Sequence, residues 1–118
     1  MVMSFDPARF LAVANDLASQ ASDEGRLRTA VGRAYYSVFL LAREKTGVPN
    51  KRNVHSRSHA ALKRMSGCRA AGDMLAKLNR PREVADYQLL PSDPVDRDWI
   101  QNWSNAKQLA NLILPKVQ

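Results

Sequence analysis

The sequence predicts an all-α fold. Apolar residues recur three and four positions apart along most of the chain, alternation typical of a strand is sustained nowhere, and glycines and prolines fall at the ends of the periodic stretches. A chain of 118 residues is the length of one domain. We therefore expect residues 1–118 to form a single up-and-down bundle of four long helices plus one shorter or broken helix.

The first helix is expected to start at Ser4 or Asp6, with Pro7 in its first turn, because proline is preorganised for that position. It should reach about Gln20. Its apolar stripe follows helical spacing and consists of Phe10, Ala14, Leu17 and Ala21.

The second helix is expected to be capped by Ser22 and to run through residues 26–44 to about Thr46. Gly47, with Pro49 just beyond it, then ends the helix in the usual C-terminal arrangement. The stretch 26–44 is apolar on more than one side, so it should lie at the centre of the bundle. Its arginines should lie on a polar edge that is not covered by the core and that faces a functional partner.

A third helix should follow a short basic loop, with Asn53 or Ser56 as its cap and an end near Ser66. Its inward positions include two imidazoles, His55 and His59. A face of this kind is unusual for a core, and these side chains are either functional or partly buried and hydrogen-bonded near the helix start.

The fourth helix is expected from about Ala70, and Pro81 should leave a break near Asn79 before the helix continues. Residues 89–96 form the clearest loop. A last helix should end at Pro115. Its inward stripe is Val95, Trp99, Trp103, Ala106, Ala110 and Ile113, and the two tryptophans are expected in the core or in a dimer interface.

The net charge of +7 is concentrated in one segment. Residues 26–69 hold eleven basic residues and one acidic residue, whereas the remainder of the chain is acidic. Clustered positive charge attracts polyanions, so we expect a basic surface that binds RNA or a nucleotide. The alternative is that these side chains are solvated helix faces. The cations expected to bind are Arg26, Arg33, Lys51 and Arg57.

A polar pocket is expected between the second and fourth helices. Arg33 and Arg82 would line it, with Tyr36 or Tyr87 stacking on a base or ribose. In the alternative interpretation Asp86 forms a structural ion pair with Arg33, or with Arg82 four residues away on its own helix, and the tyrosines are core rings.

The chain is expected to be soluble and cytoplasmic, since it has no apolar span of 18 residues and no run typical of a signal peptide. The single cysteine, Cys68, cannot form an internal disulfide. His55 and His59 could both reach one metal ion, but no carboxylate or cysteine on the same helix completes a site, so neither a metal nor a cofactor is expected.

Three motifs resemble the HEPN family of helical domains. They are RAYYSVF at residues 33–39, the pair His55 and Ser56, and R-x-x-A-D-Y at residues 82–87, in the order and spacing of that family. The resemblance implies a helical bundle that is commonly a homodimer. It also implies binding of RNA or nucleotide, and pairing with a small nucleotidyltransferase in a prokaryotic two-component system of the toxin–antitoxin type.

Several members of the family that this sequence resembles are metal-independent ribonucleases. In those members an arginine and a histidine are separated by four to six residues and are paired across the dimer interface. Arg52 and His59 have six residues between them, and His55 lies nearby. The resemblance therefore implies these three residues as a candidate catalytic group, in which histidine would act as the base. A purely structural helical dimer is the third interpretation.

Overall fold

The computed structural model describes residues 5–19 and 23–118, and these residues form five α-helices, one short 3₁₀ helix and no strand. The predicted all-α class is therefore confirmed for the described residues. The elements are α1 (Arg9–Ala18), α2 (Glu24–Thr46), α3 (Val54–Arg64), α4 (Arg69–Tyr87), η1 (Pro94–Arg97) and α5 (Trp99–Val117).

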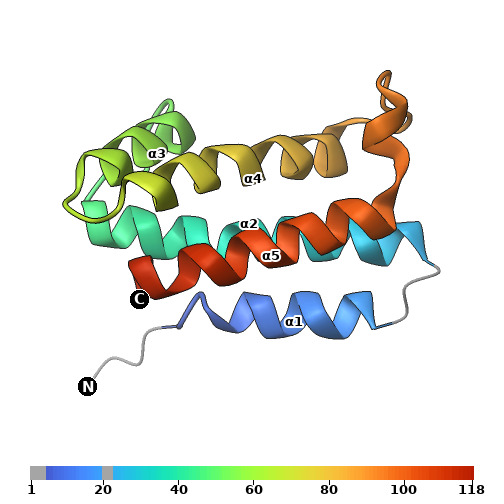
Figure 1. The fold of residues 1–118 in the computed structure, drawn as a ribbon, viewed down its shortest axis with the longest axis horizontal. Helices are drawn as coiled ribbons and strands as arrows, with labels where there is room; N and C mark the ends of the chain where they lie inside the picture. The colour runs from blue at the N-terminus through green and yellow to red at the C-terminus, as the bar shows by residue number, and fades with distance from the viewer. Residues whose placement is uncertain (1–4, 20–22) are drawn as a thin grey trace.

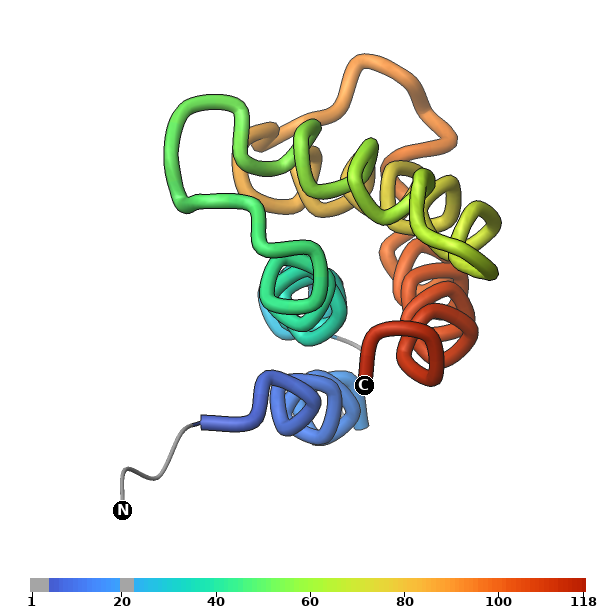
Figure 2. The backbone as a smooth tube through the Cα atoms, turned by 90° about the vertical axis from the view of Figure 1, so that its left-hand side faces the viewer, coloured from blue at the N-terminus to red at the C-terminus, as the bar shows by residue number. Residues whose placement is uncertain are grey.

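Helix α2 lies at the centre of the bundle and contacts the other four α-helices. Helices α1, α2, α4 and α5 run in alternating directions along the long axis of the molecule (Figure 1). Seen from the end, α1 lies on one side of α2 and α5, while α3 and α4 lie on the other side (Figure 2). The central place predicted for residues 26–44 is confirmed, since ten residues of α2 are buried.

Two helices are short rather than one. Helix α1 has 10 residues and α3 has 11, whereas the other three have 19 to 23. Helix α1 starts only at Arg9, because the Asp6 carboxylate accepts a hydrogen bond from the backbone N–H of Ala8 and holds the preceding turn. The predicted limits Ser4 and Gln20 lie outside the described residues.

The cap of α2 is Asp23, one residue later than predicted, and Ser22 lies outside the described residues. The Asp23 carboxylate accepts hydrogen bonds from the N–H groups of Gly25 and Arg26 at 2.8 and 3.3 Å. The predicted end is confirmed. Gly47 has a left-handed backbone with φ of 72°, which favours glycine and closes the helix.

Both helical prolines were expected to interrupt a helix, and both expectations are wrong. Helix α4 continues through Pro81 without a break at Asn79, because Leu78 and Arg82 are buried on either side and keep the helix in register. Helix α5 passes Pro115 and ends two residues later, because Val117 is buried against the core. Packing therefore outweighs the lost backbone hydrogen bonds at these sites.

Helix α3 packs closely on the start of α4. Asn53, with φ of 62°, precedes the helix, but its side chain makes no capping hydrogen bond, and Ser56 donates to its carbonyl. A Cβ atom at Gly72 would lie 2.7 Å from the backbone nitrogen of Lys63. Only glycine therefore allows the two helices to approach this closely.

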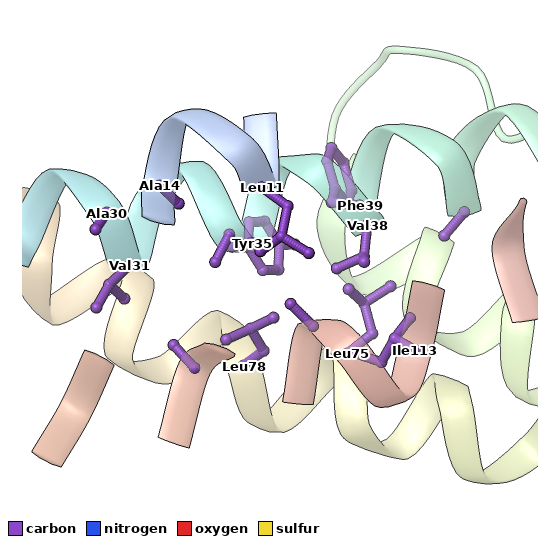
Figure 3. Packing of buried hydrophobic residues seen from close by; sticks show 14 of the residues in the cluster. Leu11, Ala14, Ala30, Val31, Tyr35, Val38, Phe39, Leu75, Leu78 and Ile113 are labelled. Atoms are coloured by element: carbon purple, nitrogen blue, oxygen red, sulfur yellow. The ribbon is translucent and has the colours of Figure 1, made fainter. Parts of the chain in front are cut away.

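The core lies between α2 and the helices around it (Figure 3). Tyr35 and Leu75 are among its largest fully buried side chains. Trp99 is buried as predicted and Trp103 is half-buried, but the predicted inward position of Val95 is wrong, since 75% of its surface is exposed. Val95 belongs to η1, which precedes α5 and does not continue its apolar stripe.

Candidate nucleic-acid interface

Three helices bring their polar and aromatic side chains together around Tyr35. On α2, Tyr35 and Phe39 are four residues apart, and on α3 the same spacing separates His55 from His59. The spacing places each pair on one face of its helix. The Phe39 ring stacks on the His55 ring, with centroids 4.3 Å apart.

The Tyr35 hydroxyl lies between the two imidazoles, 2.8 Å from Nδ1 of His55 and 2.9 Å from Nε2 of His59. A hydroxyl has one proton, so it donates to one ring and accepts from the N–H of the other. The arrangement gives the inner nitrogen of each ring a hydrogen-bond partner when both rings are neutral. The prediction that the histidines are hydrogen-bonded and partly buried near the helix start is confirmed.

The pKa of His59 is lowered to about 4, chiefly by burial, with smaller contributions from the neighbouring His55 ring and the Arg82 guanidinium. Burial also lowers the pKa of His55, again with a contribution from Arg82. The pKa of Tyr35 is raised, chiefly because its phenol is buried. Both imidazoles and the phenol are therefore uncharged at neutral pH.

The outer nitrogens of the two rings are not fully buried, although His59 as a whole is only 7% exposed. Among the described residues, Ser58 Oγ is the only fully buried side-chain nitrogen or oxygen without a hydrogen-bond partner, and nothing in the structure explains it. Nε2 of His55 and Nδ1 of His59 also have no partner in that part of the chain. His55 is the more exposed of the two histidines, so its outer nitrogen is the better placed to meet an outside group.

Arg82 is a buried cation at the edge of this cluster. Its guanidinium lies over the rings of Tyr35 and Tyr36, 5.1 and 5.8 Å from their centroids. Asn79 accepts two of its hydrogen bonds, at 2.6 and 3.2 Å, and Asp86 lies 3.5 Å away. Arg82 is thus fixed in place, and its charge acts on the whole cluster.

Arg33 is held differently. Its guanidinium lies 4.9 Å from the Phe10 ring centroid and 5.5 Å from that of Tyr36, but no acceptor bonds it within residues 5–19 and 23–118. Two rings therefore position a half-buried cation while leaving its N–H donors available. Arg33, Tyr36 and Arg82 form what we call the arginine–tyrosine face.

The predicted pocket residues Arg33, Arg82 and Tyr36 are thus brought together. Tyr87 is not part of the group and is 77% exposed at the end of α4. Asp86 pairs with Arg82 on its own helix, as one alternative predicted, and not with Arg33 in the described structure.

The predicted cations divide between two places. Lys51, Arg52 and Arg57 are exposed on the loop before α3 and on its first turns, close in sequence to His55. Arg26 lies at the other end of α2 and donates to the carbonyls of Asp16 and Leu17, so it holds α1. The expected basic segment therefore does not form one continuous surface.

Sequence reasoning missed three members of the cluster: Tyr35, Phe39 and Asn79. The signal for the first two was the aromatic run in RAYYSVF, where a helix places Tyr35 and Phe39 on the face toward the histidines. Asn79 follows from its position three residues before Arg82 on α4.

Comparison with known proteins finds no match to a family model, to a curated protein or to a solved structure. The described residues contain no group of three or more His, Cys, Asp or Glu side chains that could hold a metal ion. No described helix is both long enough and apolar enough to cross a bilayer.

Proposed function

We propose that the protein is a HEPN-type domain that binds RNA or a nucleotide through a basic surface made by the arginine–tyrosine face and the exposed cations near α3. The observation that carries the proposal is Arg33, a guanidinium oriented by Phe10 and Tyr36 with its donors unused. Arginine in this state is suited to a phosphate, since its fork of N–H groups matches phosphate oxygens.

The surroundings of Arg33 support a nucleotide rather than a simple anion. Tyr36 presents a partly exposed ring beside two guanidinium groups, and a base could stack on its exposed part. The buried charge of Arg82 adds a positive potential. Lys51, Arg52 and Arg57 extend the positive charge toward α3, where a longer strand would find further phosphate contacts.

A second candidate function is metal-independent cleavage of RNA, and the neutral histidines favour it. A neutral imidazole can remove the proton of a ribose 2′-hydroxyl, whose oxygen then attacks the adjacent phosphorus while the bond to the 5′-oxygen breaks and that oxygen takes a proton from water. His55, or His59, would be this base. Exposed Arg52 would stabilise the charge on the phosphate, with the two residues contributed across a homodimer.

The resemblance further supports a place in a cytoplasmic two-component system. The domain would act as a homodimer beside a small nucleotidyltransferase, as one half of a toxin–antitoxin-like pair. Sedimentation equilibrium tests the dimer, and co-purification with the product of a neighbouring nucleotidyltransferase gene tests the partner. A purely structural dimer would associate but bind no RNA.

Binding is tested by fluorescence anisotropy with a single-stranded RNA oligonucleotide at low salt. Arg33→Gln should weaken binding at least about tenfold, because it removes an oriented phosphate donor. Lys107→Gln is the matched control, since it removes the same charge from an exposed position on α5. Equal losses in both variants would contradict a localised site. No binding by the wild type would favour the structural dimer.

Cleavage is tested with the same RNA in EDTA. The ribonuclease candidate expects products ending in a 2′,3′-cyclic phosphate, which disappear in His55→Gln or His59→Gln and fall strongly in Arg52→Gln. Each variant must keep the helical circular dichroism of the wild type. Binding without any cleavage would leave the binding function and reject the enzymatic one.

A further inference from the structure

Five large apolar side chains are exposed in one segment at the end of the bundle where α4 finishes and α5 begins. Leu89 is 97% exposed, and none of the five is less than 63% exposed. Large apolar side chains that are exposed together in one short segment indicate a contact site. We call this set the apolar tip: Tyr87, Leu89, Leu90, Val95 and Ile100.

The tip is held in place by backbone contacts. Arg28 of α2 donates to the carbonyl of Gln88 at 2.6 Å and to that of Leu89 at 3.0 Å, while its guanidinium stacks on Trp99. Pro91 is buried, and Arg97 donates to its carbonyl at 2.8 Å. The exposure of the apolar side chains is therefore a property of an ordered loop.

The second half of the loop is fixed as well. Arg80 pairs with the Asp96 carboxylate at 2.9 Å, and Asn102 donates to the Asp96 carbonyl. Asp93 caps η1 and Asp98 caps α5. An ordered loop that leaves five large apolar groups in water is preorganised for a partner, since little conformational entropy remains to be lost on binding.

The tip is acidic, although the protein as a whole is basic. Residues 83–100 contain five carboxylates and one arginine, and when Glu24, Arg28, Arg80 and Arg82, which contact this segment or its neighbours, are included the net charge is −2. A hollow of about 360 Å³ between α2 and α4 is bordered by two carboxylates and one cation, those of Glu24, Asp86 and Arg28, together with Tyr87 and Leu89. Apolar surface and negative charge therefore meet in the same place.

We propose that the apolar tip binds a partner protein through a segment of that protein that is apolar and carries lysine or arginine. Opposite charge around an apolar centre favours such a segment. It disfavours RNA, whose phosphates would face the carboxylates.

A second copy of this chain fits less well. Two tips facing each other would bring like charges together. The basic region of a second copy, residues 43–69, shows no exposed large apolar side chain in the described structure. The proposal concerns a surface separate from the arginine–tyrosine face, so it does not depend on the proposed RNA binding.

The test uses three synthetic amphipathic peptides of equal length, built from leucine and lysine, leucine and glutamate, or serine and lysine. The leucine–lysine peptide should bind the wild type, and the other two should bind at least tenfold more weakly. In the double variant Leu89→Ser, Leu90→Ser, the affinity for the leucine–lysine peptide should fall at least tenfold. Val13→Ser, Leu112→Ser is the matched control, since both residues are exposed elsewhere and their loss should change affinity less than twofold.

Equal binding of the leucine–glutamate peptide would overturn the charge requirement, and unchanged affinity in the Leu89, Leu90 variant would overturn the site. Sedimentation equilibrium tests whether a second copy of this chain, and not a partner protein, occupies the tip. A dimer of the wild type that dissociates in this variant would make a second copy the occupant. RNA affinity should be the same in the wild type and the variant, and a drop would show that the two surfaces are not separate.

Discussion

Residues 43–69 and residues 83–100 lie toward opposite ends of the bundle and carry net charges of +7 and −4 (Figure 1). In the first region Lys51, Arg52 and Arg57 extend into solvent. At the acidic end Arg28 and Arg97 bond backbone carbonyls and hold a loop. The comparison teaches that a cation available to a ligand differs from a cation already engaged with the fold, since Arg28 and Arg57 belong to the same basic stretch 26–69, yet Arg28 is bonded to backbone carbonyls and Arg57 is exposed.

The largest effect is expected from Arg82→Ala. This substitution removes the cation that contacts the arginine–tyrosine face and also lies beside the group formed by Tyr35, His55 and His59. The variant leaves a void against two rings and an Asp86 carboxylate without its partner, so unfolding free energy should fall by about 3 kcal/mol. Urea denaturation measures it. A loss below about 1 kcal/mol would mean that the cluster does not depend on this charge.

The next effect is a pH dependence of stability that comes from His59. The pKa of His59 is about 4 in the folded state and near 6.5 when unfolded, so the unfolded chain binds more protons between these values. The contribution of neutral His59 to the free energy of unfolding is fully present above pH 6.5 and is lost as pH falls toward 4. With the outer nitrogen partly solvated, the loss should be about 2 kcal/mol.

Urea denaturation of the wild type and of His59→Gln at pH 7 and pH 4.5 isolates this contribution from that of the carboxylates. The variant should lose less stability than the wild type over this interval. Identical losses would show that His59 charges without penalty in the folded state.

At the acidic end, Arg28→Ala should cost about 1.5 kcal/mol, since several carbonyl hydrogen bonds and the contact with Trp99 are replaced by water. The effect should be local. Hydrogen exchange of residues 88–98 should accelerate, while that of α3 stays unchanged. Faster exchange in both regions would show that the two ends are energetically coupled.

The smallest effect is expected from Leu89→Ser. A side chain that is 97% exposed contributes little to folding, so unfolding free energy should change by less than about 0.5 kcal/mol. The same substitution weakens the proposed partner contact. A large loss of stability would show that Leu89 serves the fold and would remove it from the interface.

Much of the fold follows from the sequence because helix periodicity, Gly47 and the central apolar stretch act locally. The errors at Pro81 and Pro115 have a different origin, since the burial of Arg82 and Val117 depends on neighbouring helices. Local propensity disfavours proline inside a helix, and only tertiary packing reverses that preference.

The candidate site could be predicted in part. Arg33 and Tyr36 share one face of α2 because they are three residues apart, whereas Arg82 reaches them through the packing of α4 on α2. The hydrogen bonds from Tyr35 to two histidines require the relative position of α2 and α3, which helical periodicity does not contain. The same limit explains why Arg26 belongs to the contact with α1.

The absence of a side chain at Gly72 also matters for the hydrogen bonds between Tyr35 and the two histidines. A methyl group there would meet the backbone of Lys63, one turn beyond His59, and would push the end of α3 outward. The imidazoles would then tilt away from the phenol of Tyr35 to which they are bonded. The alignment of the hydrogen bonds among Tyr35, His55 and His59 thus depends on the absence of a Cβ atom at position 72, thirteen residues beyond His59.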